Sequence, residues 1–350
     1  MNPIYTILHT LVRVTLPLYY RKIYVSGLEN IPINKPILIA SNHQNAFLDG
    51  VLVAYKMKKQ VYFLARSDAF KGKFAAKVLK AMNLVPIYRQ QDGTGVENNG
   101  KVFQWCYEAL AQNKCVLIFP EGTCEPHKHM FPLKKGMSRI ALGALESYPD
   151  MDIQILPVGV NYSEHFGFRS FTWVDYGKPI SVQAVAKEFQ SSGEQIKILT
   201  SRVEEELKNI VLHLPKEDYA LEDERMTTNM KVLRPTSGRQ LVEIERSKVK
   251  NEKPPKRISN DLLRYFLSFP FLIIHQPLYY LVDQLAAKMT GKDEFYPSVK
   301  YGLCTLLFAV YWAICSYIFT LIFDIPRYAM FLIWFAFPTS LWIGFKIRRV

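Results

Sequence analysis

The sequence predicts an α/β protein, with a mixed sheet wrapped by helices, followed by a C-terminal helical membrane region. The first half of the chain contains short apolar runs rich in β-branched residues, which are typical of buried strands. The last part contains two longer apolar runs, each close to the ~20 residues needed to span a bilayer. The expected strands occupy residues 36–40, 83–89, 116–123 and 153–162.

Residues 41–49, directly after the first run, place His43 and Asp49 a few positions apart. An imidazole is the usual base for a hydroxyl proton at neutral pH, and a nearby carboxylate fixes its tautomer and stabilises the cation. No other histidine stands at an expected strand end with a carboxylate shortly after it. The pair predicts half of a catalytic site. The structural alternative is a polar cap at His43 and an ordinary helix residue at Asp49.

The other three runs also end in residues able to bind or polarise a ligand. Ligands of open α/β sheets bind outside the carboxyl ends of the strands, so we expect four strand ends to share one site. Arg89 offers a planar fork of donors suited to phosphate. We expect Glu121 to accept a hydrogen bond from a hydroxyl and Gly122 to let the backbone approach an anion. A tight turn with a solvent-facing acid is the alternative for Glu121.

These four blocks, taken in order, resemble the motifs of the glycerolipid acyltransferase superfamily, the PlsC-type enzymes that acylate glycerol phosphates. The resemblance covers roughly residues 30–180. His43 with Asp49 matches the first motif, 87–89 the second, 119–123 the third and 156–158 the fourth. It implies a glycerolphosphate acyltransferase-like fold and acyl-CoA or acyl carrier protein as the acyl donor. It also implies a glycerol-phosphate acceptor and no cofactor beyond the donor.

Five residues separate His43 from Asp49, whereas the usual family pattern has four. The wider spacing, with Asn45 inside it, resembles the branch that acts on glycerol 3-phosphate and glycerone phosphate, as do residues 132–137 and 294–300. A 1-acylglycerol-3-phosphate acyltransferase is the second hypothesis. A non-enzymatic lipid-binding or membrane scaffold protein is the hypothesis from another class. Such a protein would not need His43, Asp49 and Glu121.

Acyl transfer from a thioester to an alcohol needs a base at the hydroxyl, stabilisation of the tetrahedral oxyanion and an anchor for the phosphate. We assign His43 as the base, Asp49 as the residue that orients it and Arg89 as the anchor. Lys134 and Lys135 either assist phosphate binding or are simply solvated. The remaining candidate substrate-binding residues are Asn45, Gly122, Thr123 and Pro157.

The sequence does not indicate a metal site. His127, His129 and His165 lack a carboxylate or cysteine partner at a usual ligand spacing. Cys124 could be an acyl-accepting nucleophile, but no base is identified for it, and direct transfer explains His43 without it. The five cysteines have no disulfide-framework spacing, which favours a reduced enzyme facing the cytoplasm.

The chain divides into four expected regions. Residues 1–25 form an amphipathic membrane-surface helix or, alternatively, a helix packed on the enzyme's own core, and we expect no secretory signal peptide there. Residues 26–215 form the catalytic domain, residues 216–258 a charged, irregular linker and residues 259–350 the membrane region. A helix over 195–212 closes the catalytic domain, with a buried stripe of Ile196, Ile198, Leu199, Val203, Leu207 and Val211.

The membrane region contains apolar runs at 299–323 and 328–345, which predict a transmembrane hairpin; a buried soluble helix pair is the alternative. Both flanks of the hairpin are basic, which favours the cytoplasmic side for them. Residues 262–287 predict an interfacial or re-entrant helix pair hinged near Pro277, with a third spanning helix as the alternative. The net charge of +13 has no nucleic-acid motif beside it, so we expect an anionic bilayer and phosphorylated substrates as partners.

Overall fold

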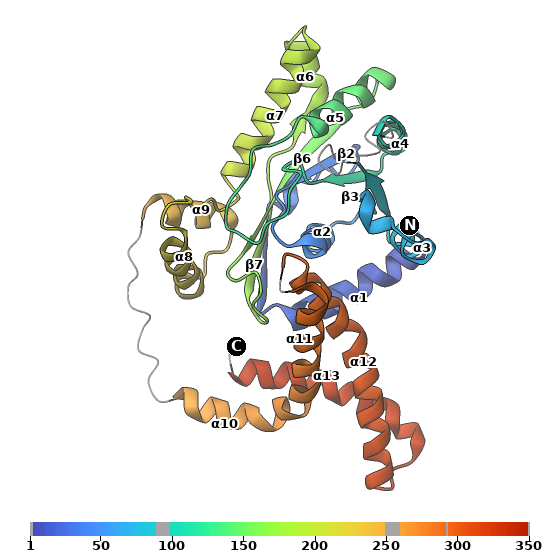
Figure 1. Cartoon of the computed structure of the whole chain (residues 1–350), viewed down its shortest axis with the longest axis vertical. Helices are drawn as coiled ribbons and strands as arrows, with labels where there is room; N and C mark the ends of the chain where they lie inside the picture. Colours follow the sequence, from blue (N-terminus) through green and yellow to red (C-terminus); the bar gives the residue numbers. More distant parts are fainter. Residues whose placement is uncertain (1–2, 89–98, 249–259, 292, 349–350) are drawn as a thin grey trace. The chain divides into compact units, whose positions relative to one another are not determined.

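The computed structural model describes residues 3–88, 99–248, 260–291 and 293–348 (Figure 1). The chain forms two compact units. The first unit comprises Met1–Val14, Lys22–His165 and Ser170–Lys250. The second unit comprises Thr15–Arg21, Phe166–Arg169 and Asn251–Val350.

The first unit is built around a mixed sheet, which confirms the predicted fold class. Within the described residues the sheet has eight strands in the order β1-β7-β6-β2-β5-β3-β4, with β8 paired to β6. Strands β2 to β6 are mutually parallel where they pair, whereas β7 and β8 run antiparallel to β6. The strands are β1 (Lys22–Ser26), β2 (Ile37–Ser41), β3 (Val61–Arg66), β4 (Leu84–Ile87), β5 (Cys115–Ile118), β6 (Gln154–Tyr162), β7 (Phe171–Tyr176) and β8 (Ile180–Ser181).

The strand register brings the predicted motifs to one edge of this sheet. Ala40 of β2 lies opposite Ile118 of β5, and Ser41 lies opposite Val158 of β6. Because these strands are parallel, the residues that follow β2 and β5 leave the sheet on the same side. All four runs expected to be strands contain one, namely β2, β4, β5 and β6.

Helices cover both faces of the sheet. Leu38 and Ala40 of β2 belong to the main core cluster, which also contains buried residues of α4, α5 and α7. On the other face, Gly50 of α2 lies against the Phe63 ring of β3, 3.2 Å from a Cβ placed there. All six residues of the stripe predicted for a helix over 195–212 are buried in this cluster or packed against it, but the helix spans Ser192–Lys208, so Val211 lies beyond its end. The helices are α2 (Ala46–Ala54), α3 (Lys73–Ala81), α4 (Asn99–Ala111), α5 (Gly136–Ser147), α6 (Val182–Glu188) and α7 (Ser192–Lys208).

The prediction of an irregular linker over residues 216–258 is wrong for the part of it that the structure describes. Residues 216–258 contain two helices, α8 (Tyr219–Leu233) and α9 (Gly238–Arg246). Met226, Met230 and Leu241 from these helices are fully buried against strand residues, including Trp173, in a second core cluster. The indole N–H of Trp173 also donates to the carbonyl of Pro235 at 2.7 Å. Met226 and Met230 lie one helical turn apart and are buried, whereas Leu221 and Leu233 of the same helix are exposed, so no clear apolar stripe marks α8 in the sequence.

The N-terminal segment is the helix α1 (Pro3–Tyr19), and its first part packs on the first unit. The hydroxyl of Tyr5 accepts a hydrogen bond from the Val61 amide at 3.2 Å, and His9 Nε2 donates to the carbonyl of Ala54 at 3.1 Å. Other apolar side chains of this helix are exposed: Ile4, Ile7, Leu11 and Val14. The helix thus packs on the core along one side, and its location at a membrane surface stays a prediction.

The second unit is helical, with α10 (Asn260–Leu272), α11 (Gln276–Thr290), α12 (Tyr296–Ile322) and α13 (Met330–Arg348). The pair of helices predicted over 262–287 is present, and its break at Ile273–His275 lies just before Pro277. Tyr296–Ile322 and Met330–Ile347 are long and apolar enough to cross a membrane. Only 22% and 17% of these two stretches is buried within the structure, which is low for the core helices of a soluble protein.

Candidate active site

The His43–Asp49 pair lies in the turn between β2 and α2. His43 Nδ1 is 2.9 Å from Asp49 Oδ2, and the Asp49 side chain is fully buried. The same carboxylate oxygen accepts the backbone N–H groups of Gln44 and Asn45 at 2.8 and 2.7 Å, and Asp49 Oδ1 accepts the Tyr162 hydroxyl at 2.6 Å. An ionised carboxylate only accepts hydrogen bonds, so the proton lies on His43 Nδ1. His43 Nε2 therefore presents its lone pair as a base.

The wider spacing between these two residues is compatible with direct contact. The chain turns sharply after Asn45, where Ala46 adopts a φ of 42°, in the left-handed region that non-glycine residues rarely occupy. This turn aims two successive N–H groups at the first turn of α2, in which Asp49 lies. The strained backbone at Ala46 therefore lies where the chain holds the Asp49 carboxylate with two N–H groups.

Aromatic and amide contacts fix the imidazole from outside the pair. The His43 ring stacks on Phe119, with ring centroids 3.9 Å apart and planes within 11°. The buried Asn42 side chain bridges to β6, since its amide donates to the Val160 carbonyl at 2.9 Å and its oxygen accepts the Val160 N–H at 2.8 Å. Asn42 was not among the predicted site residues, although a polar residue directly after an apolar strand was a signal for it. The His43 side chain keeps 19% of its surface exposed, so a substrate can reach it.

Glu121 is buried near the pair, and its side chain does not point to solvent. The residue is 2% exposed, and within the described chain neither carboxyl oxygen has a hydrogen-bond partner of regular geometry. Burial raises the pKa of Glu121 to about 8, against a weaker lowering by the backbone N–H groups of Phe131 and His43. The charge of Asp49 raises this pKa further. The solvent-facing alternative is therefore wrong.

Gly122 closes a tight turn after β5. Its N–H donates to the Phe119 carbonyl at 3.1 Å, so this group is not aimed at an anion as expected. With a φ of 66° the position suits glycine, and a Cβ there would lie 2.7 Å from Lys134 Nζ. The exposed Lys134 thus carries its ammonium group over this turn. Lys135 is exposed just before α5 begins.

The other predicted substrate-binding residues differ in position. Asn45 is buried beside Asp49, and its side-chain amide donates to the His165 carbonyl at 3.4 Å. Thr123 is half-buried in the loop after the Gly122 turn. Pro157 lies inside β6 opposite Ala40, buried within the sheet and short of the strand end. Arg89 lies outside the described residues.

The side chains considered for metal or nucleophilic roles are distributed as follows. Cys124 Sγ accepts the Ala46 N–H at 3.2 Å and lies with ligand atoms of His43 and Asp49 in a group spanning 4.8 Å. Spacing alone did not predict this grouping. His127 is 3.7 Å from the Glu125 carboxylate, and His129 stacks against His213 at 4.2 Å between centroids. His165 Nε2 instead contacts the Gln44 side chain at 3.1 Å.

The residues of this candidate site lie within a segment that is similar to known proteins. Residues 22–161 match the family model described as Acyltransferase. This segment is similar to the Acyltransferase family. The match runs from β1 to β6 and includes all four motifs, so the predicted resemblance is confirmed. The helices α8 and α9 lie beyond the matched acyltransferase segment.

Relatives of this acyltransferase segment carry two different names. Glycerol-3-phosphate O-acyltransferase 1 of Saccharomyces cerevisiae is 33% identical over 34% of this chain and 17% of its own length. The chloroplastic 1-acyl-sn-glycerol-3-phosphate acyltransferase LPAT1 of Arabidopsis thaliana is 30% identical over 35% of this chain and 33% of its own. The chain thus spans a third or less of either relative. The crystal structure of PlsC from Thermotoga maritima aligns with a TM-score of 0.42 at 20% identity, over 58% of this chain and 78% of that one.

Proposed function

We propose that this chain transfers a fatty acyl group from acyl-CoA or acyl carrier protein to a hydroxyl of a glycerol phosphate, on the route to phosphatidic acid. The observation that carries the proposal is the 2.9 Å contact between His43 Nδ1 and the buried Asp49 carboxylate, which leaves His43 Nε2 as a base. The reaction needs no cofactor beyond the acyl donor.

In this mechanism His43 Nε2 takes the proton of the acceptor hydroxyl while the hydroxyl oxygen attacks the thioester carbonyl. A tetrahedral oxyanion forms, and its collapse breaks the carbon–sulfur bond. The leaving thiolate takes the proton back from His43. Asp49 stabilises the imidazolium through its hydrogen bond and does not itself receive the proton.

Two further groups have roles at the acceptor. The buried Glu121 carboxyl is suited to bind a second hydroxyl of the acceptor, which would give its oxygens a hydrogen-bond partner of regular geometry that the described residues do not provide. The Lys134 ammonium group, over the Gly122 turn, supplies positive charge for the acceptor's phosphate. Arg89 stays the proposed main phosphate anchor because its fork binds two phosphate oxygens at once.

Glycerol 3-phosphate or glycerone phosphate is the proposed acceptor. The wider His43-to-Asp49 spacing supports it, as does the similarity to the yeast glycerol-3-phosphate O-acyltransferase 1. The second candidate is 1-acylglycerol 3-phosphate, which is favoured by the name of the Arabidopsis relative. Both acceptors would use the same base and the same phosphate anchor.

We further propose that α12 and α13 anchor the enzyme as a transmembrane hairpin, with the catalytic unit facing the cytoplasm. The apolar length of the two helices and the basic residues at both ends of the hairpin support this topology. Deletion of residues 299–350 should release much of the protein from carbonate-washed membranes. Full retention of the truncated protein would move the anchor to α1 or to α10 and α11.

The function is tested with the purified full chain and labelled acyl-CoA. Glycerol 3-phosphate, glycerone phosphate and 1-acylglycerol 3-phosphate are offered separately, and His43→Ala protein is the control. We expect product with one of the first two acceptors, and about 10²- to 10⁴-fold slower formation of that product with the variant. Absence of product with all three acceptors would contradict the proposal.

A further inference from the structure

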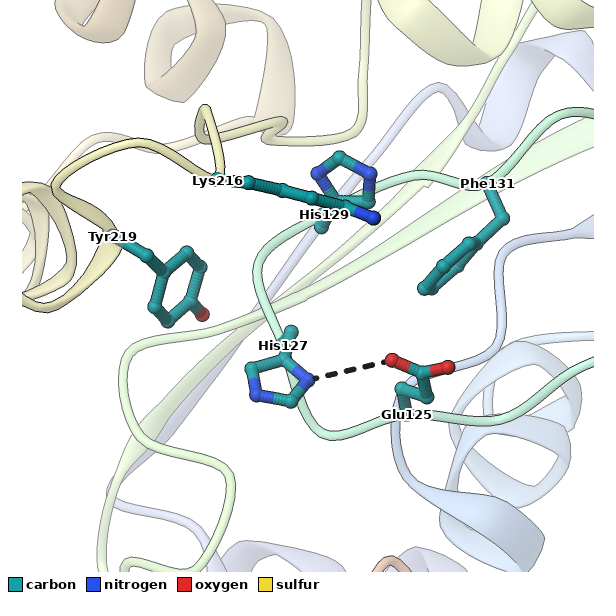
Figure 2. A pocket seen from close by; sticks show the side chains of 6 residues that line it. All are labelled: Glu125, His127, His129, Phe131, Lys216 and Tyr219. Carbon is teal, nitrogen blue, oxygen red and sulfur yellow. Dashed lines mark ion pairs between the residues drawn. The ribbon is translucent and has the colours of Figure 1, made fainter.

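A cavity of about 260 Å³ lies in the first unit, in the loop that follows the Gly122 turn (Figure 2). Most of its wall comes from that loop, and the remainder comes from Lys216, just before α8, and from Tyr219, the first residue of α8. The wall begins next to the catalytic pair, because the Glu125 N–H donates to the His43 carbonyl at 3.4 Å. The lining residues are Glu125, His127, His129, Phe131, Lys216 and Tyr219.

Buried contacts hold this wall in place. The Lys128 side chain is almost fully buried between the Asp223 carboxylate and the Thr227 hydroxyl, which lies at 2.9 Å. The Lys128 N–H donates to the Tyr219 hydroxyl at 2.8 Å, and the Lys128 carbonyl accepts the Leu214 N–H at 2.7 Å. The loop is therefore fastened to α8, which lies outside the segment matched by the family model.

The lining combines aromatic planes with one cation and one carboxylate. The His127 and Tyr219 rings lie 5.3 Å apart, edge to face, and Lys216 Nζ lies 6.0 Å from the Phe131 ring centre. Figure 2 shows the Lys216 side chain extending from the Tyr219 side toward His129, with the Glu125–His127 pair on another wall. Aromatic faces suit a flat heteroaromatic ring, and an ammonium group suits a phosphate attached to it.

The size and charge of the cavity narrow the choice of ligand. Its volume is just below the ~300–1,000 Å³ of pockets that take a whole drug-sized ligand, so it suits one end of a larger molecule. A compact glycerol phosphate would offer nothing to stack on the rings and would meet the Glu125 carboxylate. An adenine ring instead has an exocyclic amine that can donate to such a carboxylate.

We propose that this cavity binds the adenine nucleotide end of acyl-CoA. The inference rests on the proposed function and deepens it, because it assigns acyl-CoA as the donor rather than acyl carrier protein, whose pantetheine arm carries no nucleotide. Adenine stacks among the rings, Lys216 pairs with a nucleotide phosphate and Glu125 accepts the exocyclic amine. The thioester end then extends toward His43.

Binding is tested without turnover by titrating adenosine 3′,5′-bisphosphate, the nucleotide fragment of CoA, into full-length His43→Ala protein. Adding Lys216→Met should weaken binding about tenfold, because a charge-assisted contact is lost while the side-chain length is kept. Lys216→Arg should restore most of the affinity. Lys187→Met, which changes an exposed lysine of α6, is the matched control and should bind normally. Equal affinity of the Lys216→Met and control proteins would overturn the proposal.

Kinetics on the protein with His43 intact give an independent test. Lys216→Met should raise the KM for acyl-CoA about tenfold, and leave unchanged the acceptor KM and turnover of acyl-pantetheine, which lacks the nucleotide. Equal losses with acyl-CoA and acyl-pantetheine would contradict the site. If the nucleotide binds in a Lys216-dependent way but no acyl transfer occurs, the nucleotide site is supported and the proposed function is contradicted. If acyl transfer occurs but the KM for acyl-CoA does not depend on Lys216, the proposed function is supported and the nucleotide site is contradicted.

Discussion

Two buried carboxyl groups follow neighbouring strands of the same sheet, and they differ in their surroundings. Asp49, after β2, accepts hydrogen bonds from His43, from two backbone N–H groups and from Tyr162. Glu121, after β5, is equally buried but has no partner of regular geometry within the described residues. Residues of the protein supply the hydrogen-bond donors to Asp49, whereas a donor of regular geometry for Glu121 would have to come from a ligand. We infer that Asp49 prepares the base and that Glu121 receives the substrate.

The largest effect is expected for the base itself. His43→Ala should lower kcat by about 10²- to 10⁴-fold and leave the fold intact, because a general base is lost from a partly exposed position. Steady-state kinetics and circular dichroism measure the two quantities. A variant that retains more than about a tenth of the wild-type kcat would show that His43 is not the base.

Asp49→Asn should lower kcat nearly as much, because an amide no longer fixes the imidazole tautomer. It should also lower Tm, since an amide nitrogen cannot accept the hydrogen bonds that a carboxylate oxygen accepts. Kinetics and thermal melts of the same preparation check both parts. Unchanged kcat together with lower Tm would make Asp49 purely structural.

Glu121→Leu should lower activity without lowering the stability of the fold. Kcat/KM for the acceptor should fall about 10²-fold, because the substrate hydroxyl loses its partner. Tm should stay constant or rise, because an apolar side chain replaces a buried carboxyl whose oxygens have no hydrogen-bond partner of regular geometry among the described residues. A clear fall in Tm would mean that Glu121 already has a partner in the free protein.

Tyr162→Phe should lower kcat about tenfold, a smaller effect than Asp49→Asn. The substitution removes the bond to Asp49 Oδ1, whereas the bonds to Oδ2 that hold the carboxylate against His43 persist. Loss of one hydrogen bond to a charged group costs about 1.5–3 kcal/mol of stability. Urea unfolding measures that loss, with kcat taken in parallel. An effect on kcat as large as that of Asp49→Asn would make Tyr162 part of the reacting group.

The last prediction concerns the dependence of stability on pH. The folded protein keeps the Glu121 proton up to about pH 8, whereas the unfolded chain releases it near the ordinary value of 4.5. The unfolded state therefore gains stability relative to the folded state as pH rises through this interval. Unfolding free energies of wild type should fall relative to Glu121→Gln between pH 5 and pH 8. Parallel curves for the two proteins would place the Glu121 pKa near its ordinary value.

Much of the candidate site was predictable because its residues follow the predicted strands within a few positions of the chain. Apolar runs predicted four strands, and the chemistry of His43, Asp49 and Glu121 followed from their positions after those runs. Pro157 shows the limit of this approach, since a motif residue inside a strand can be buried in the sheet away from its end. The helices α8 and α9 were missed because their apolar residues are few and separated by charges, so only burial against Trp173 reveals their role.

The sequence by itself determined the fold class, the four motif strands, the His43–Asp49 pair and the two long apolar helices, because each depends on residues close together along the chain. The tertiary structure alone decided which groups meet. The parallel register of β2, β5 and β6 brings Tyr162 to Asp49, Phe119 to His43 and Lys134 to the Gly122 turn. It also decided that Asp49 is fully hydrogen-bonded while Glu121 is not. Three of the bonds to Asp49 come from residues close in the sequence, but the Tyr162 bond and the surroundings of Glu121 depend on residues distant in sequence, which no local pattern specifies.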